Sequence, residues 1–151
     1  MKKKDTATII INTDGASRGN PGAASAGAVL SDDTGVVHAR EKKTLGTMTN
    51  NEAEYEAVLL GLNAAKRVFG TARLKESSVE LRLDSQLIAR QLNGDYQIKE
   101  SRLFPYYIAV HNIRVSTIPN LVVTHVRREE NKAADALANE ALDEGGQGGL
   151  L

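Results

Sequence analysis

Cysteine and tryptophan are both absent from this chain of 151 residues. Without cysteine the chain forms no disulfide, thiolate zinc site or iron–sulfur cluster, and it needs no oxidising compartment. A metal ion would be held by oxygen ligands or by the three histidines. Long apolar runs are also missing, since none approaches the roughly 18 residues that a membrane-spanning helix requires. These absences predict a cytoplasmic protein that does not contact a membrane.

Neither sign of charge dominates, because 19 Lys and Arg balance 19 Asp and Glu. The net charge therefore does not indicate a nucleic-acid partner, although a neutral sum can combine a basic face with an acidic pocket. With 41% hydrophobic and 25% charged residues, the composition is typical of a globular protein. The length fits one domain of ordinary size. We expect one folded domain over residues 1–143 and a flexible glycine-rich tail over residues 144–151.

Strand and helix patterns follow one another in an order that favours an α/β fold. Three short strand-like segments open the chain, and from Asn50 the apolar period becomes that of a helix. The predicted strands cover residues 6–13, 23–30, 36–45, 79–83 and 121–126, and the predicted helices cover residues 50–69, 85–93, 99–115 and 131–143. This order predicts a five-stranded mixed sheet, three antiparallel strands followed by two parallel ones, with helices on both faces.

Acidic residues are predicted to gather at one edge of this sheet. Asp14 and Asp84 each end a strand, and we expect these two strands to be adjacent, with the site beyond their carboxyl ends. Glu54 lies within the apolar stripe of its helix, whereas Glu52 and Glu56 are predicted to face solvent. An ionised carboxylate on a buried face needs a compensating partner or a metal ion. Taken singly, Asp14 also fits an Asp-Gly turn and Asp84 a helix start.

A fourth acid, Asp135, lies at the edge of the core side of the last helix, where a solvent-facing role is also reasonable. Four acids in one pocket repel one another unless cations neutralise them. The lack of cysteine and of a histidine cluster favours Mg²⁺ or Mn²⁺ over zinc. Two such ions about 4 Å apart hold the attacking water and the leaving oxygen of a phosphoryl displacement, which indicates phosphodiester cleavage.

Spaced motifs surround these acids. They are Asp14-Gly15-Ala16-Ser17-Arg18-Gly19-Asn20-Pro21-Gly22, Thr49-Asn50-Asn51 followed by Glu54, Asp84-Ser85-Gln86, and Asn131 followed by Asp135. Over residues 6–143 the chain thereby resembles the type 1 ribonuclease H family. The resemblance implies a ribonuclease H-like catalytic domain that hydrolyses the RNA strand of RNA/DNA hybrids and leaves 5′-phosphate and 3′-hydroxyl ends. It also implies two Mg²⁺ or Mn²⁺ ions per site when substrate is bound.

For each motif in turn, the resemblance implies which residues form the site. The catalytic acids and metal ligands would be Asp14, Glu54, Asp84 and Asp135. Contacts with the minor groove of the hybrid would come from Gly15, Ser17, Asn20, Asn50, Asn51 and Gln86, and a grip on a DNA phosphate from Thr49. Uncharged donors and acceptors suit 2′-hydroxyls and minor-groove base edges. Asn50 as a helix cap and Gln86 as an exposed first-turn residue are equally ordinary.

Two departures from the family pattern concern substrate grip and the loop before Asp135. The basic, tryptophan-bearing extension that many members carry after the fourth-strand helix is reduced here to residues 93–96, which predicts weak substrate affinity. His125 and Arg128 compete for one catalytic role in the loop. His125 keeps the spacing of the family histidine to Asn131, but it also fits the fifth strand, and in that case Arg128 takes over.

Other interpretations of the function stay open at this point. The same fold could cleave double-stranded RNA, or it could bind hybrid without cleaving it. The presence of all four acids argues against the second interpretation. We expect a monomeric endoribonuclease whose partner is an RNA/DNA hybrid.

Overall fold

The computed structural model describes the backbone of residues 8–150 and the side chains of residues 8–145. The five strands are β1 (Thr8–Gly19), β2 (Gly22–Asp32), β3 (Val37–Met48), β4 (Ser78–Leu83) and β5 (Leu121–His125). They form one sheet in the order β3-β2-β1-β4-β5. β2 pairs antiparallel with both β1 and β3, whereas β4 pairs parallel with both β1 and β5. The predicted mixed sheet, with three antiparallel strands followed by two parallel ones, is confirmed.

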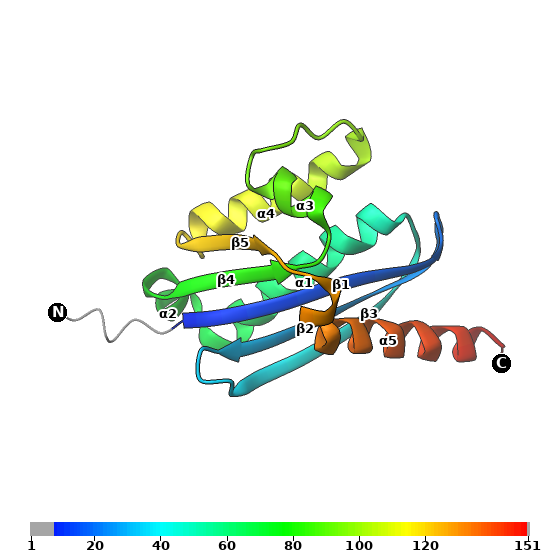
Figure 1. The fold of residues 1–151 in the computed structure, drawn as a ribbon, viewed down its shortest axis with the longest axis horizontal. Coiled ribbons are helices and arrows are strands. Elements are labelled where there is room, and N and C mark those ends of the chain that lie inside the picture. Colours follow the sequence, from blue (N-terminus) through cyan, green and yellow to red (C-terminus); the bar gives the residue numbers. More distant parts are fainter. Residues whose placement is uncertain (1–7, 151) are drawn as a thin grey trace.

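Helices cover both faces of the sheet, as predicted (Figure 1). They are α1 (Asn50–Phe69), α2 (Thr71–Glu76), α3 (Gln86–Leu92), α4 (Phe104–Ser116) and α5 (Lys132–Leu150), with 3₁₀ turns η2 (Ser101–Leu103) and η3 (Arg128–Glu130). Neighbouring residues of β2 identify the two faces, because successive side-chain positions of a strand point to opposite sides. Gly27 lies against the backbone of α5, and Ala28 lies near Gly61 of α1.

The hydrophobic core lies mainly between α1, α4 and the sheet. Its fully buried side chains include Ile9, Ile11, Leu62, Leu81 and Leu103. The apolar period of α1 brings its buried stripe onto β1 and β2. Among the described helices, none is both long enough and apolar enough to cross a bilayer.

Strand β1 is longer than predicted. The sequence pattern predicts an end at Thr13 and a turn at the following Asp-Gly pair, whereas the strand continues to Gly19. It continues because every residue from Asp14 to Gly19 pairs with a residue of β2. The chain reverses only at the Gly19-to-Gly22 turn. Residues 6 and 7 of the predicted strand lie outside the described part of the chain.

Two helices also differ from their predicted bounds. The single helix expected over residues 99–115 is divided into η2 and α4, with Pro105 in the first turn of α4, where its missing N–H costs nothing. α5 begins at Lys132 and extends to Leu150, past the predicted end at Asp143. The predicted mobility of residues 144–151 stays a prediction.

Candidate active site

Three of the predicted acids meet beside the junction of β1, β4 and α1. Thr13 and Leu83 are the last residues that pair between β1 and β4, and Asp14 and Asp84 follow them directly. Glu54 reaches the same place from the second turn of α1. One carboxylate oxygen from each acid lies within 4.8 Å of the other two. The tertiary structure therefore brings the two strand acids and the helix acid into one cluster.

The close approach of α1 to β1 depends on a glycine. A Cβ atom on Gly15 would lie 2.4 Å from the backbone carbonyl carbon of Ala53, a distance that real side chains do not tolerate. The backbone N–H of Gly15 also hydrogen-bonds to the Glu54 carboxylate. Gly15 thus allows the contact between strand and helix that places Glu54 beside Asp14.

The acidic cluster opens into a polar cavity of about 560 Å³. Asp135 lines this cavity from the first turn of α5, together with Asp14, Glu54 and Arg128. The other lining residues are Gly15, Ala16, Ser17, Arg18, Asn50, Asn139 and Leu142. The four predicted acids therefore lie at one edge of the sheet, three as a tight cluster and Asp135 beside Asp14, to which it hydrogen-bonds.

Electrostatic repulsion and burial hold two of these acids away from their ordinary ionisation. Burial, reinforced by repulsion from Glu54 and Asp84 and by a hydrogen bond with Asp135, raises the pKa of Asp14 to about 9. Burial and the charge of Asp84 raise the pKa of Glu54 to about 8, against the opposing effect of the Gly15 N–H and of Arg128. Without a counter-ion, this site resists carrying its full negative charge at neutral pH.

The donor atoms of the cluster fit a divalent cation. Within the described side chains, Oε1 of Glu54 and Oδ2 of Asp84 are buried and have no hydrogen-bond partner. A buried carboxylate oxygen without a partner is costly, and a cation ligated by oxygen removes that cost. The ligand set consists of hard oxygens without sulfur or imidazole, which suits Mg²⁺ or Mn²⁺.

Helix α5 is tied to β1 by an asparagine whose anchoring role was not predicted from the sequence. Asn131 is buried, and its Nδ2 donates to the carbonyl oxygen of Thr13 at 2.9 Å. Its Oδ1 accepts a hydrogen bond from Nδ2 of Asn12 at 3.0 Å, and its carbonyl accepts from the N–H of Asp135 at 3.1 Å. The four-residue spacing between Asn131 and Asp135, which puts both on one helix face, was the available signal.

The two candidates for the loop role lie in different places. His125 is the exposed last residue of β5 and pairs with Leu83, so it belongs to the strand, which is the alternative that the sequence left open. Arg128 lies in η3 and lines the acidic cavity, where its charge acts on Glu54. Of the two, only Arg128 lines the cavity.

The glutamates flanking Glu54 are half-buried, so the prediction that they face solvent is wrong. Glu52 closes a capping box at the start of α1: its carboxylate accepts from the N–H of Thr49 at 2.9 Å, and Oγ1 of Thr49 accepts from the N–H of Glu52 at 3.2 Å. Glu56 hydrogen-bonds to Tyr106 of α4. The prediction used the helical period alone, which takes no account of the capping box or of the neighbouring helix α4.

The remaining candidates for substrate contact lie around the β1–β2 turn and the starts of α1 and α3. Oδ1 of Asn20 accepts from the backbone N–H of Asn50 at 2.9 Å, which ties the turn to α1. Nδ2 of Asn51 donates to Glu100 at 3.0 Å. Oγ of Ser17 donates to the carbonyl oxygen of Met48 at 3.2 Å, and Gln86 is exposed at the start of α3.

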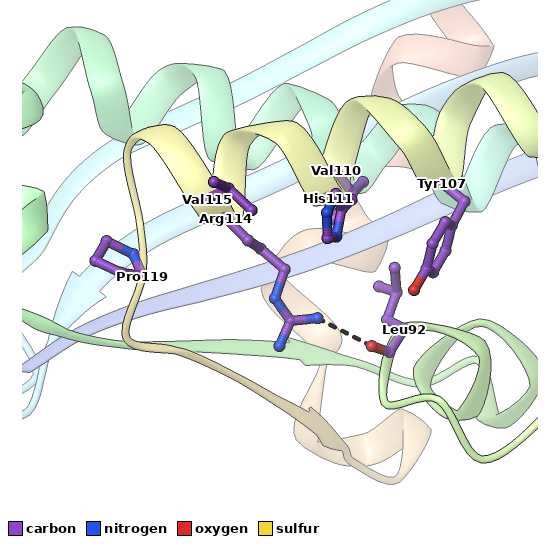
Figure 2. A pocket seen from close by; sticks show the side chains of 7 residues that line it. All are labelled: Leu92, Tyr107, Val110, His111, Arg114, Val115 and Pro119. Carbon is purple, nitrogen blue, oxygen red and sulfur yellow. Dashed lines mark hydrogen bonds between the residues drawn. The ribbon is translucent and has the colours of Figure 1, made fainter.

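A second hollow, of about 390 Å³, lies between α4, the end of α3 and the start of β5 (Figure 2). Arg114 reaches across it and donates to the carbonyl oxygens of Leu92 at 2.9 Å and Leu121 at 3.3 Å. His111 stacks on Tyr107 at the same wall. No carboxylate lines this hollow, and its arginine is committed to backbone carbonyls. This hollow therefore offers no acidic group for metal binding or acid–base chemistry.

Comparison with known proteins adds sequence relatives. A family model described as reverse transcriptase-like matches residues 12–141. Ribonuclease HI of Halobacterium salinarum is 41% identical over 131 residues, which cover 87% of this chain and 62% of that protein. The bifunctional protein Rv2228c of Mycobacterium tuberculosis is 34% identical over 140 residues, covering 92% of this chain and 36% of that protein. The chain thus spans less than two thirds of the length of either relative.

Solved structures agree with the fold. LC11-RNase H1, isolated from compost and crystallised in complex with an RNA/DNA hybrid, has a TM-score of 0.87 at 42% identity, covering 91% of this chain and 98% of that chain. The N-terminal RNase H domain of the mycobacterial protein has a TM-score of 0.82 at 31% identity, covering 95% and 99%. The family model, the relative at 41% identity and the matching fold of the solved structures agree with the five-stranded sheet and the acidic cluster at its edge. The chain belongs to the type 1 ribonuclease H family.

Proposed function

We propose that this chain is a metal-dependent endoribonuclease that hydrolyses the RNA strand of RNA/DNA hybrids and leaves 5′-phosphate and 3′-hydroxyl ends. The observation that carries the proposal is the cluster of Asp14, Glu54 and Asp84, with two buried carboxylate oxygens that have no partner. Membership of the family and the hybrid bound to LC11-RNase H1 support the choice of substrate.

The four acids would hold the metal ions. Asp14, Glu54 and Asp84 each offer an oxygen within 4.8 Å of the other two, and Asp135 lines the same cavity and hydrogen-bonds to Asp14. Two Mg²⁺ or Mn²⁺ ions held by these residues with substrate would supply activation of the attacking water and stabilisation of the leaving oxygen. The raised pKa values of Asp14 and Glu54 mean that these carboxyls take up protons readily when no cation is present.

Arg128 would stabilise the phosphate electrostatically. Its guanidinium lines the cavity and stays charged across physiological pH, so it favours an anionic reaction centre but does not serve as a general base. His125 would serve a proton-transfer or product-release role if it reached the site from the end of β5. The exposed position of His125 at the strand end supports assigning the assisting role in this loop to Arg128.

The rim around the cavity would read the shape and the 2′-hydroxyls of the hybrid. The proposed minor-groove contacts are Gly15, Ser17, Asn20, Asn50, Asn51 and Gln86. These residues, which include three asparagines, a glutamine and a serine, provide donors and acceptors without charge, as 2′-hydroxyl recognition requires. Thr49 caps α1 as an acceptor, so its hydroxyl hydrogen is left to donate to a DNA phosphate.

One assay tests the proposal directly. Labelled RNA/DNA hybrid, double-stranded RNA and double-stranded DNA are incubated with the chain in Mg²⁺, Mn²⁺ or EDTA. We expect internal cuts in the RNA strand of the hybrid with either metal and none in EDTA. Cutting of double-stranded RNA alone would support the alternative substrate, and hybrid binding without cleavage would overturn the enzymatic proposal.

We also propose that the chain acts as a monomer in the cytoplasm, and sedimentation velocity with and without hybrid tests the oligomeric state.

A further inference from the structure

One face of β1 carries more than the catalytic aspartate. Alternate residues of a strand share a face, so Asn12, Asp14, Ala16 and Arg18 lie on the same side. That side is the one covered by α5, because Asn12 bonds to Asn131 and Arg18 forms an ion pair with Asp143. At about 3.3 Å per residue, Arg18 lies about 13 Å along the strand from Asp14. An arginine therefore follows the catalytic acid on its own strand face.

Helix α5 runs alongside this strand face with matching spacing. Asp135, Asn139 and Asp143 follow one another at intervals of four residues and so share one helix face. At 1.5 Å per residue, Asp143 lies about 12 Å beyond Asp135. Arg18, Asn139 and Leu142 line the same cavity as the acids. The cavity thus extends from the acidic cluster at one end to Arg18 at the other, where Arg18 pairs with Asp143.

The ion pair at this end is exposed and exchangeable. The side chain of Arg18 is 55% exposed and that of Asp143 is 61% exposed. Exposed ion pairs contribute little to stability, so the arginine can leave its partner at low cost. A phosphate is a strong alternative partner, because a guanidinium binds two of its oxygens at once. A nucleic-acid backbone in the cavity would compete directly with Asp143.

We propose that Arg18 binds a phosphate of the substrate other than the one being hydrolysed, and that Asp143 restrains Arg18 until the substrate displaces it. This inference rests on the proposed function, since the cavity must first accept a nucleic-acid strand. It adds a positive contact at the end of the cavity remote from the metal ligands. Substrate affinity is then set in part by the competition between an internal carboxylate and the substrate phosphate.

The experiment measures kcat and KM for hybrid cleavage in Mg²⁺ over a range of KCl concentrations. Asp143→Asn frees Arg18, so we expect KM to fall about threefold with kcat unchanged. Arg18→Gln removes the contact, so we expect KM to rise about threefold to tenfold and the slope of log KM against log salt to decrease by about one. In the double variant, Asp143→Asn should no longer lower KM, because the arginine that it frees is absent.

A neighbouring ion pair on α5 provides the matched control. Glu140 pairs with Lys42 at 2.7 Å and neither residue lines the cavity, so Glu140→Gln removes one negative charge from the same helix without freeing Arg18. We expect its KM to match that of the unmodified chain. If Glu140→Gln and Asp143→Asn lower KM equally, or if Asp143→Asn still lowers KM in the Arg18→Gln background, the inference is overturned. Failure of the unmodified chain to cut hybrid would instead reject the proposed function itself.

Discussion

Replacing Asp14 by asparagine should abolish cleavage and at the same time stabilise the metal-free protein. Asp14 is only 5% exposed and shares its pocket with Glu54, Asp84 and Asp135. Asparagine has nearly the same shape but removes the charge that the pocket disfavours. Stability and activity are therefore expected to change in opposite directions, as they do where acids are held together for function.

The size of the effect follows from the geometry of the cluster. Carboxylate oxygens of the cluster lie within 4.8 Å of one another, and at that upper limit two unit charges repel by about 3.5 kcal/mol at an effective dielectric constant of about 20. Protonation of the folded state limits this cost, so we expect Asp14→Asn to raise the free energy of unfolding by about 2 kcal/mol at pH 8 in EDTA. For a chain of this length that corresponds to a Tm increase of about 4–8 °C.

The pH dependence has a definite sign. The pKa of Asp14 is about 9 in the folded state and near its ordinary value of 3.8 in the unfolded state, so the folded state binds the extra proton between these values. The free energy of unfolding of the unmodified chain should therefore fall as pH rises from about 4 towards 9. The free energy of unfolding of Asp14→Asn should therefore exceed that of the unmodified chain by an amount that increases over the same pH interval.

Urea denaturation at several pH values, in EDTA or in about 10 mM Mg²⁺, checks this prediction. Mg²⁺ should stabilise the unmodified chain by mass action and should reduce the advantage of the variant. Asp33→Asn, at an exposed turn, is the control and should change stability by less than about 0.5 kcal/mol. A variant that is less stable than the unmodified chain at pH 8 in EDTA would refute the assignment of a repulsive acid cluster.

Other substitutions test the remaining parts of the site. Glu54→Gln should be inactive, whereas Glu56→Gln should retain turnover because its contact is with α4, and equal loss in both would contradict the placement of Glu54. Gly15→Ala should lower the free energy of unfolding by about 1–3 kcal/mol in urea, since its Cβ would push α1 away, and unchanged stability would rule out the close contact. Arg128→Ala should lower kcat for hybrid cleavage more than His125→Ala does, and the reverse order would restore the histidine as the assisting residue.

Much of the site could be predicted from the sequence because its chemistry is local. Glu54 is recognisable by its place in an apolar helical stripe, and Asp84 by its place between a short strand with alternating apolar residues and a helix start. The lack of cysteine leaves oxygen as the main ligand type, which selects the class of metal before any coordinates are known. The order of strand and helix segments likewise predicts the mixed sheet.

Only the tertiary structure decided the points that depend on a partner distant in sequence. β1 continues past Asp14 because β2 pairs with it, and no local pattern contains that pairing. Arg128, and not His125, lines the acidic cavity because β5 ends at the histidine and the next turn bends back over the acids. Arg18 meets Asp143 because a strand and a helix 125 residues apart run side by side. Periodicity determines which face a residue occupies, whereas packing determines what that face meets.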